Sequence, residues 1–77
     1  MSINYAALLT DEQKRNVLEQ RIAQFALEAY QHTLNKTTCE ALEDKNGVSL
    51  AENSLATLEA AITTHQAELA ALPAVTE

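Results

Sequence analysis

The chain has 77 residues, too few for more than one domain, so residues 1–77 are predicted to form a single domain. Eleven acidic against five basic side chains give a formal net charge of −6, which disfavours nucleic acid as a partner because phosphates bind to positive surfaces. A lone cysteine, the lack of an apolar run near the roughly 20 residues of a membrane span and the lack of a signal-peptide pattern predict a protein of a reducing compartment, with no membrane contact.

Residues 1–10 are predicted to form a short apolar lead-in, and the capping box that follows begins the first helix. Thr10 is expected to accept the backbone amide of Gln13, whose own side chain reaches back to the cap. No glycine or proline interrupts the chain before Gly47. We therefore predict one helix over 11–44, which would be about 50 Å long.

A turn is predicted over 45–49, where Gly47 can take the left-handed conformation that ends many helices. A second helix is predicted over 50–72, stopped by Pro73, and 73–77 is predicted to be a tail. The abundance of alanine and leucine agrees with these helices. The predicted fold class is therefore all-α: an antiparallel helical hairpin with one long and one shorter helix, coiled-coil-like and oligomeric.

The predicted first helix carries two apolar stripes, although a hairpin partner covers only one. At 100° per residue the two stripes lie roughly 140° apart. The first stripe consists of Leu18, Ile22, Phe25 and Ala29, and the second stripe of Ala23, Leu27, Tyr30, Leu34 and Ala41. The predicted second helix carries a heptad seam that includes Leu55, Leu58, Ile62, Leu69 and, as its one polar member, His65.

The second stripe is predicted to pack against this seam, with Leu27 near His65. The predicted hairpin core is then Leu27, Tyr30, Leu34, Leu55, Leu58, Ile62 and Leu69. The first stripe (Leu18, Ile22, Phe25 and Ala29) is left for the lead-in or for another copy of the chain. Burial of each of its large side chains contributes on the order of 1.5–3 kcal/mol, so we predict self-association through the first stripe, as a dimer or a trimer.

Catalysis is not expected, because a two-helix hairpin offers no cleft that could gather a nucleophile, a base and a group to hold developing charge. The only soft metal ligands of the chain are His32, Cys39 and His65. Their spacing keeps them apart, so no metal site and no cofactor are predicted. Lys14, Arg15 and Arg21 form a candidate anion patch near the start of the first helix, with an ordinary solvated face as the alternative.

Four segments made of helix-forming residues are 9–15 (LTDEQKR), 20–25 (QRIAQF), 28–32 (EAYQH) and 55–69. In these segments the chain resembles small all-helical accessory proteins of tailed bacteriophages. The resemblance implies a protein of the host cytoplasm or the virion, with a larger viral or host protein as a further partner, and it identifies no functional residues.

The expected function is therefore that of a non-enzymatic helical packing module, a structural or assembly component of a phage. The alternative is a phage counter-defence protein that binds a host protein or sequesters a nucleotide signal. The net charge of −6 is suited to covering basic sites, and the stripe left over from the hairpin supplies an apolar contact surface.

Overall fold

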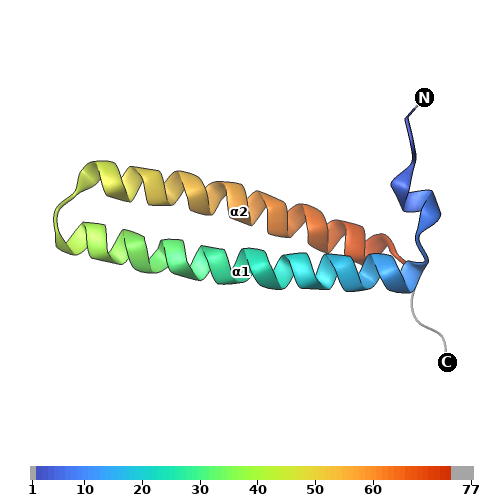
Figure 1. Ribbon diagram of the computed structural model, residues 1–77. Coiled ribbons are helices and arrows are strands. Elements are labelled where there is room, and N and C mark those ends of the chain that lie inside the picture. Colours follow the sequence, from blue (N-terminus) through green and yellow to red (C-terminus); the bar gives the residue numbers. More distant parts are fainter. Residues whose placement is uncertain (1, 74–77) are drawn as a thin grey trace.

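The computed structural model of the chain describes residues 2–73. It consists of a short 3-10 helix, η1 (Tyr5–Leu8), and two long α-helices, α1 (Asp11–Ala41) and α2 (Lys45–Ala71). The two long helices lie side by side and run in opposite directions (Figure 1). Because the described residues contain no strand, the predicted all-α hairpin of one longer and one shorter helix is confirmed.

The predicted capping box begins α1. Thr10 Oγ1 accepts the backbone amide of Gln13 at 3.1 Å, and Gln13 Oε1 accepts the backbone amide of Thr10 at 2.9 Å. These bonds satisfy amides that the start of the helix would otherwise leave without partners. Asp11 and Glu12 follow in the first turn, where the helix dipole favours negative charge. The first helix therefore starts where the sequence predicts it.

The end of α1 comes earlier than predicted, at Ala41, because the chain leaves the helix through a Schellman motif. The backbone amide of Asp44 donates to the carbonyl of Cys39 at 2.8 Å, and the amide of Glu43 donates to the carbonyl of Glu40 at 3.1 Å. This motif needs one residue in the left-handed conformation. Glu43 supplies it, with a φ angle of 57°.

The predicted turn over 45–49 is wrong, since these residues form the first part of α2. Asp44 caps this helix, its Oδ1 accepting the backbone amide of Gly47 at 3.0 Å. A Cβ atom on residue 47 would lie 2.5 Å from Cys39 Sγ and 2.6 Å from Asp44 Oδ2, closer than real Cβ contacts. A side chain at residue 47 would therefore displace the Cys39 and Asp44 side chains where α2 approaches α1, and Gly47 does not adopt the left-handed conformation.

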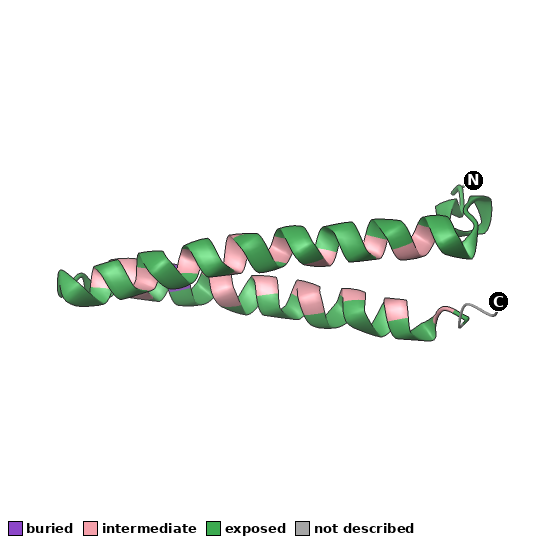
Figure 2. Cartoon of the chain, turned by 90° about the horizontal axis from the view of Figure 1, so that it is seen from below, coloured by how far each residue is buried: buried purple, intermediate pink, exposed green. Residues whose placement is uncertain are grey.

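The hairpin is thin and has almost no enclosed core. Its principal extents are 52 × 37 × 14 Å, and the smallest is close to the diameter of about 10–12 Å of a single helix with its side chains. Figure 2 shows partly buried residues along the facing sides of the two helices and exposed residues on their outer sides. Among the described residues only Ala51 is buried, with 5% of its surface exposed. The helices therefore stabilise each other along one seam.

The lead-in turns away from the open end of the hairpin (Figure 1). Its apolar residues Ile3, Tyr5 and Leu8 are exposed, so little of it packs against the long helices. Of the predicted lead-in and tail, Met1 and residues 74–77 lie outside the described residues. None of the helices within 2–73 combines the length and the apolar character that crossing a bilayer requires.

Candidate functional site

The first stripe of α1 faces α2 and forms the seam of the hairpin. Its members Leu18, Ile22, Phe25 and Ala29 are partly buried, as are Leu55, Leu58, Ile62 and Leu69 on α2. The Phe25 ring meets the imidazole of His65 edge-on, with the ring centroids 5.0 Å apart and the planes at 78°. His65 Nδ1 lies 2.6 Å from the carbonyl oxygen of Ala61, which fixes the orientation of the imidazole. The structure therefore corrects the prediction that this stripe is the surface for another copy of the chain.

The second stripe of α1 lies on the outer face of the helix. The predicted hairpin core included Leu27, Tyr30 and Leu34, but these side chains are 54%, 63% and 48% exposed. Phe25 has taken the place beside His65 that was predicted for Leu27. This part of the predicted core is wrong, and the two stripes of α1 have exchanged roles.

The turn decides which face of α1 is covered. Gly47 brings the first turn of α2 against Cys39. Cys39 belongs to a row that steps back along α1 by seven residues at a time. The members of the row are Cys39, His32, Phe25 and Leu18. Residues seven apart lie on nearly the same side of a helix, so α2 follows this row. The heptad spacing of this row is visible in the sequence, but the second stripe has the same spacing, so spacing alone does not select the row that α2 covers.

Two polar contacts, one between the helices and one from α1 to the residue two positions after the end of α2, mark the register of the hairpin. Towards the turn, Lys36 Nζ lies 3.7 Å from Glu52 Oε1. At the open end, a guanidinium nitrogen of Arg15 donates to the carbonyl oxygen of Pro73 at 2.7 Å. Polar contacts at an exposed surface contribute little free energy of folding. They therefore act on the alignment of the two helices more than on the stability of the fold.

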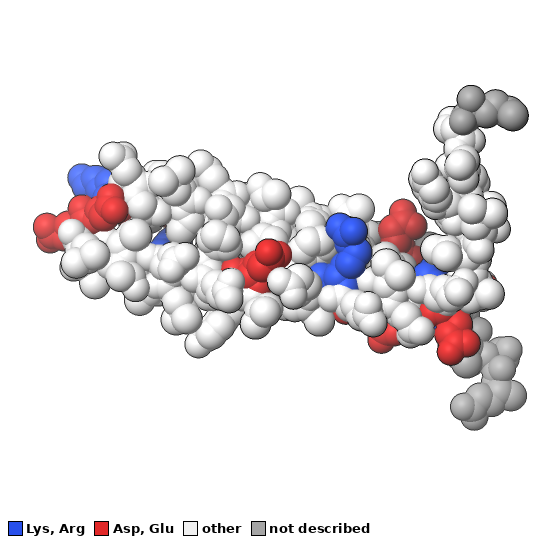
Figure 3. All heavy atoms as spheres, in the orientation of Figure 1, with Lys and Arg blue, Asp and Glu red and all other residues white. Residues whose placement is uncertain are grey.

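The second stripe forms an uncharged apolar band along the outer face of α1. Between Gln13 and Ala41, no Asp, Glu, Lys or Arg lies within about 40° of the centre of this band at 100° per residue. The polar residues beside it include Asn16, Gln20 and Thr38, which are uncharged, and Glu19, about 50° to one side of its centre. On the face drawn in Figure 3, most of the surface between the two ends of the hairpin is likewise uncharged. An exposed apolar band of this kind is typical of a surface that contacts another protein.

The candidate anion patch does not form a free cluster of positive charge. Lys14 Nζ lies 3.9 Å from Asp11 Oδ1, and Arg15 makes the bond across the open end of the hairpin. The guanidinium of Arg21 lies over the Phe25 ring, 5.3 Å from its centroid. At 100° per residue, Arg15 also points about 100–120° away from the other two positive side chains. All three therefore act within the hairpin, and residues 2–73 offer no shared anion site.

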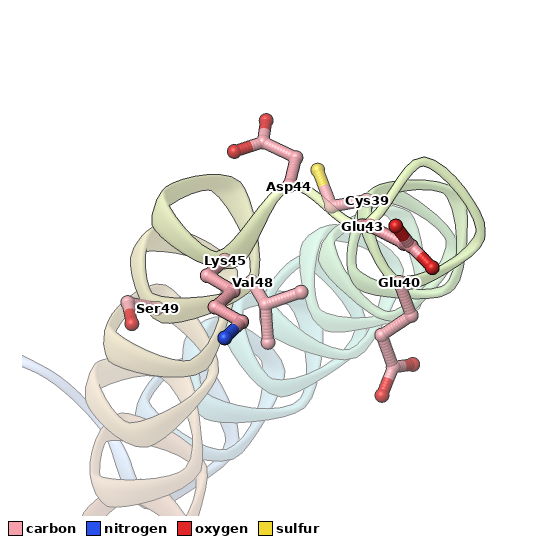
Figure 4. Close-up of a pocket in the computed structure, with 7 residues that line it drawn as sticks. All are labelled: Cys39, Glu40, Glu43, Asp44, Lys45, Val48 and Ser49. Atoms are coloured by element: carbon pink, nitrogen blue, oxygen red, sulfur yellow. The ribbon is translucent and has the colours of Figure 1, made fainter.

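The turn end of the hairpin carries an open, acidic hollow. It is lined by Cys39 and by the carboxylates of Glu40, Glu43 and Asp44, together with the start of α2. The three carboxylates point in different directions (Figure 4), so they do not converge on one point where a cation would bind. Within the described part of the chain, no group of three or more His, Cys, Asp or Glu is placed to hold a metal ion. The hollow is therefore a solvated end of the molecule.

No family model, curated protein or solved structure matches the chain. The resemblance to phage accessory proteins stays a prediction. What the chain does is inferred from the surfaces of the hairpin itself.

Proposed function

We propose that this chain is a non-enzymatic helical packing module, which acts by binding an exposed apolar helix face to another protein surface. The observation that supports this function is the second stripe, because Leu27, Tyr30 and Leu34 remain about half exposed in a band that, between residues 13 and 41, has no charged residue within about 40° of its centre. Removal of apolar surface from water contributes roughly 25 cal/mol per Å². A protein surface that covers the stripe therefore stabilises the hairpin as it binds.

The total surface of the hairpin also favours a packed working state. Its solvent-accessible surface is 6120 Å², whereas the scaling for compact monomers gives about 4,600 Å² for a chain of 8.4 kDa. The difference of about 1,500 Å² exceeds the roughly 800 Å² that each partner contributes to a standard protein–protein interface. The chain therefore exposes enough surface, beyond that of a compact monomer of its mass, to form at least one stable interface.

Within this proposal, the chain is a structural or assembly component of a tailed-phage particle, found in the host cytoplasm or in the virion. Its partners are further copies of itself and a larger viral protein. The support for the phage context is the resemblance of segments 9–15, 20–25, 28–32 and 55–69 to small phage accessory proteins. The support for the packing role is the elongated hairpin with its uncovered stripe.

The test is mass spectrometry of virions and assembly intermediates purified from infected cells that produce the full chain. The wild-type chain is expected at a fixed copy number relative to the major structural proteins. Leu27→Glu should be produced in the cells and lost from the particles, because it places a charge in the apolar stripe. Leu50→Glu, at an exposed position of α2, is the matched control and should be retained. Absence of the wild-type chain from both particles and intermediates would contradict the phage role.

The alternative is a counter-defence protein that binds a host protein through the same stripe. A net charge of −6 favours association with a basic site. Sequestration of a nucleotide signal has less support, because the two candidate arginines, Arg15 and Arg21, already contact Pro73 and Phe25. A binding screen of the full chain against host defence proteins and cyclic nucleotides separates the two functions. Tight binding to one host protein, without incorporation into particles, would favour counter-defence.

A further inference from the structure

We propose that the second stripe of α1 binds the second stripe of another copy of the chain, with the two α1 helices antiparallel. A two-fold axis passes between Leu27 and Tyr30, and the helices lie in the order α2, α1, α1 of the second copy, α2 of the second copy. This inference rests on the packing function proposed above. It deepens that function by naming the surface and its occupant.

Charge makes the second stripe suited to meeting its own copy. The chain carries a formal net charge of −6, so two copies repel each other over most of their surfaces. Between Gln13 and Ala41, the charged residue nearest to the stripe is Glu19, about 50° to one side of its centre. In the antiparallel arrangement the two copies of Glu19 lie towards opposite ends of the contact, roughly 30 Å apart along the helices. Between residues 13 and 41 the contact therefore brings no like charges together.

The outer face of α1 repeats every seven residues, as the contact face of a coiled coil does. Positions 20, 27, 34 and 41 hold Gln, Leu, Leu and Ala, and positions 16, 23, 30 and 37 hold Asn, Ala, Tyr and Thr. The two rows alternate in steps of three and four along the helix. Leu27, Tyr30 and Leu34 are thus spaced as knobs that fit between the side chains of a facing helix.

The sizes of the side chains favour the antiparallel direction. About the proposed axis, Ala23 faces Leu34 of the second copy, and Leu27 faces Tyr30 of the second copy. In the outer layers the large side chain of Leu34 therefore meets the small side chain of Ala23. In a parallel pair, Tyr30 would face Tyr30 and Ala23 would face Ala23, so one layer would be crowded and another, on the far side of the Leu27 layer, would be underfilled, which close packing disfavours. Antiparallel helices also bring opposite ends of their dipoles together.

The composition of the outer faces points to α1 as the contact helix. The surplus surface of about 1,500 Å² per chain covers the roughly 800 Å² that one copy needs to contribute to a stable dimer. The outer face of α2 carries small side chains instead. They include Ala56, Ala60, Ala67 and Ala71, all exposed. Small side chains bury little apolar area, so this face adds little to association by comparison with Leu27, Tyr30 and Leu34.

Sedimentation equilibrium of the full chain tests the contact. Wild type is expected to show twice the chain mass of 8.4 kDa. Leu27→Glu is expected to show the chain mass, with dimer affinity weakened by at least about 100-fold, because it buries two carboxylates in the contact. Ala60→Glu is the matched control, since it adds the same charge to the outer face of α2, and it should remain a dimer. Circular dichroism checks that both variants keep their helices.

Three results would overturn the proposal. A Leu27→Glu dimer of wild-type affinity would exclude the stripe as the contact, and loss of the dimer in both variants would indicate that α1 of one copy meets α2 of the next. A monomeric wild type would also overturn it. The packing function itself depends on incorporation into particles, so its failure is distinguishable from the failure of this contact.

Cysteine cross-linking tests the geometry without adding a charge. In a Cys39→Ser background, Ala23→Cys combined with Leu34→Cys is expected to oxidise to a covalent dimer, because the two positions face each other across the contact. Within one helix they lie about 16 Å apart, too far for a disulfide. Ala23→Cys alone is expected to stay uncross-linked, because the two copies of residue 23 lie about 16 Å apart along the antiparallel helices. Rapid cross-linking of the single variant, or none of the pair, would overturn the antiparallel contact.

Discussion

Glu43 adopts a left-handed backbone conformation, with φ at 57°, which costs a residue with a side chain roughly 1–2 kcal/mol. The two hydrogen bonds of the Schellman motif hold it there, because they end α1 in that geometry. Residue preference alone would choose Gly47 for this role. Gly47 lies instead where α2 passes close to Cys39, and the left-handed position of the turn is occupied by Glu43.

Glu43→Gly is expected to raise the free energy of unfolding by about 0.5–1 kcal/mol, since relief of the left-handed strain is partly offset by the greater freedom of glycine in the unfolded chain. Urea denaturation followed by circular dichroism measures the change. The control is Glu40→Gly, which removes the same charge from a helical position and should lower stability by about 0.5–1 kcal/mol. Equal effects of the two substitutions would contradict the special role of residue 43.

Along α1, the seam that holds the hairpin together depends on one aromatic residue with partners on two sides. The imidazole of His65 packs edge-to-face with the Phe25 ring, with the ring centroids 5.0 Å apart. The guanidinium of Arg21 lies over the Phe25 ring, 5.3 Å from its centroid. Leu27, two residues further along, points away from α2 and is 54% exposed. Both rows of α1 have heptad spacing, so spacing alone does not select the one that pairs with α2.

Phe25→Ala is expected to lower the free energy of unfolding by about 1–2 kcal/mol, less than the 3–5 kcal/mol of a fully enclosed phenylalanine because Phe25 is only partly buried. Urea denaturation is again the measurement. Leu50→Ala, at a position 68% exposed on α2, should change stability by less than about 0.5 kcal/mol. A loss at residue 25 no larger than that at residue 50 would show that Phe25 does not hold the seam.

The whole molecule buries little of its surface when it folds alone. An unfolded chain of 8.4 kDa exposes about 12,200 Å², so the hairpin at 6120 Å² buries about half, against about 60% for a small compact domain. Each of the two helices buries only the side that faces the other helix and exposes its remaining sides. A layer that is one helix thick therefore cannot enclose side chains in a core. The isolated hairpin should therefore be marginal, and association should contribute a large share of its stability.

The midpoint of thermal unfolding of the wild-type chain is accordingly expected to rise with protein concentration. A tenfold increase should raise it by about 3–6 °C, if unfolding of a dimer is coupled to its dissociation. Circular dichroism over a hundredfold range of concentration gives the slope. Leu27→Glu, which lacks the proposed contact, should melt at one temperature throughout the range. A flat wild-type profile would argue against stabilisation by self-association.

Part of the candidate site was predictable from the sequence. The second stripe is visible as an apolar row on α1, and the need for two covered faces follows from the presence of two rows. Its assignment to the hairpin core was wrong, because Leu27, Tyr30 and Leu34 are exposed. The first stripe, which α2 covers, continues towards the turn through the polar residues His32 and Lys36. Its apolar part therefore ends at Ala29, although α2 covers the same side of the helix beyond that residue.

The sequence by itself determined the helices, because capping, helix propensity and chain breaks act between residues close along the chain. The cap at Thr10 and the scarcity of glycine and proline were sufficient for that. Only the tertiary structure decided where the chain turns and which side of α1 is covered. The side that is covered depends on the fit between Cys39 and the first turn of α2, where Gly47 has no side chain, and the turn is held by the Schellman motif and the Asp44 cap. Such a fit between two helices cannot be read from either helix alone.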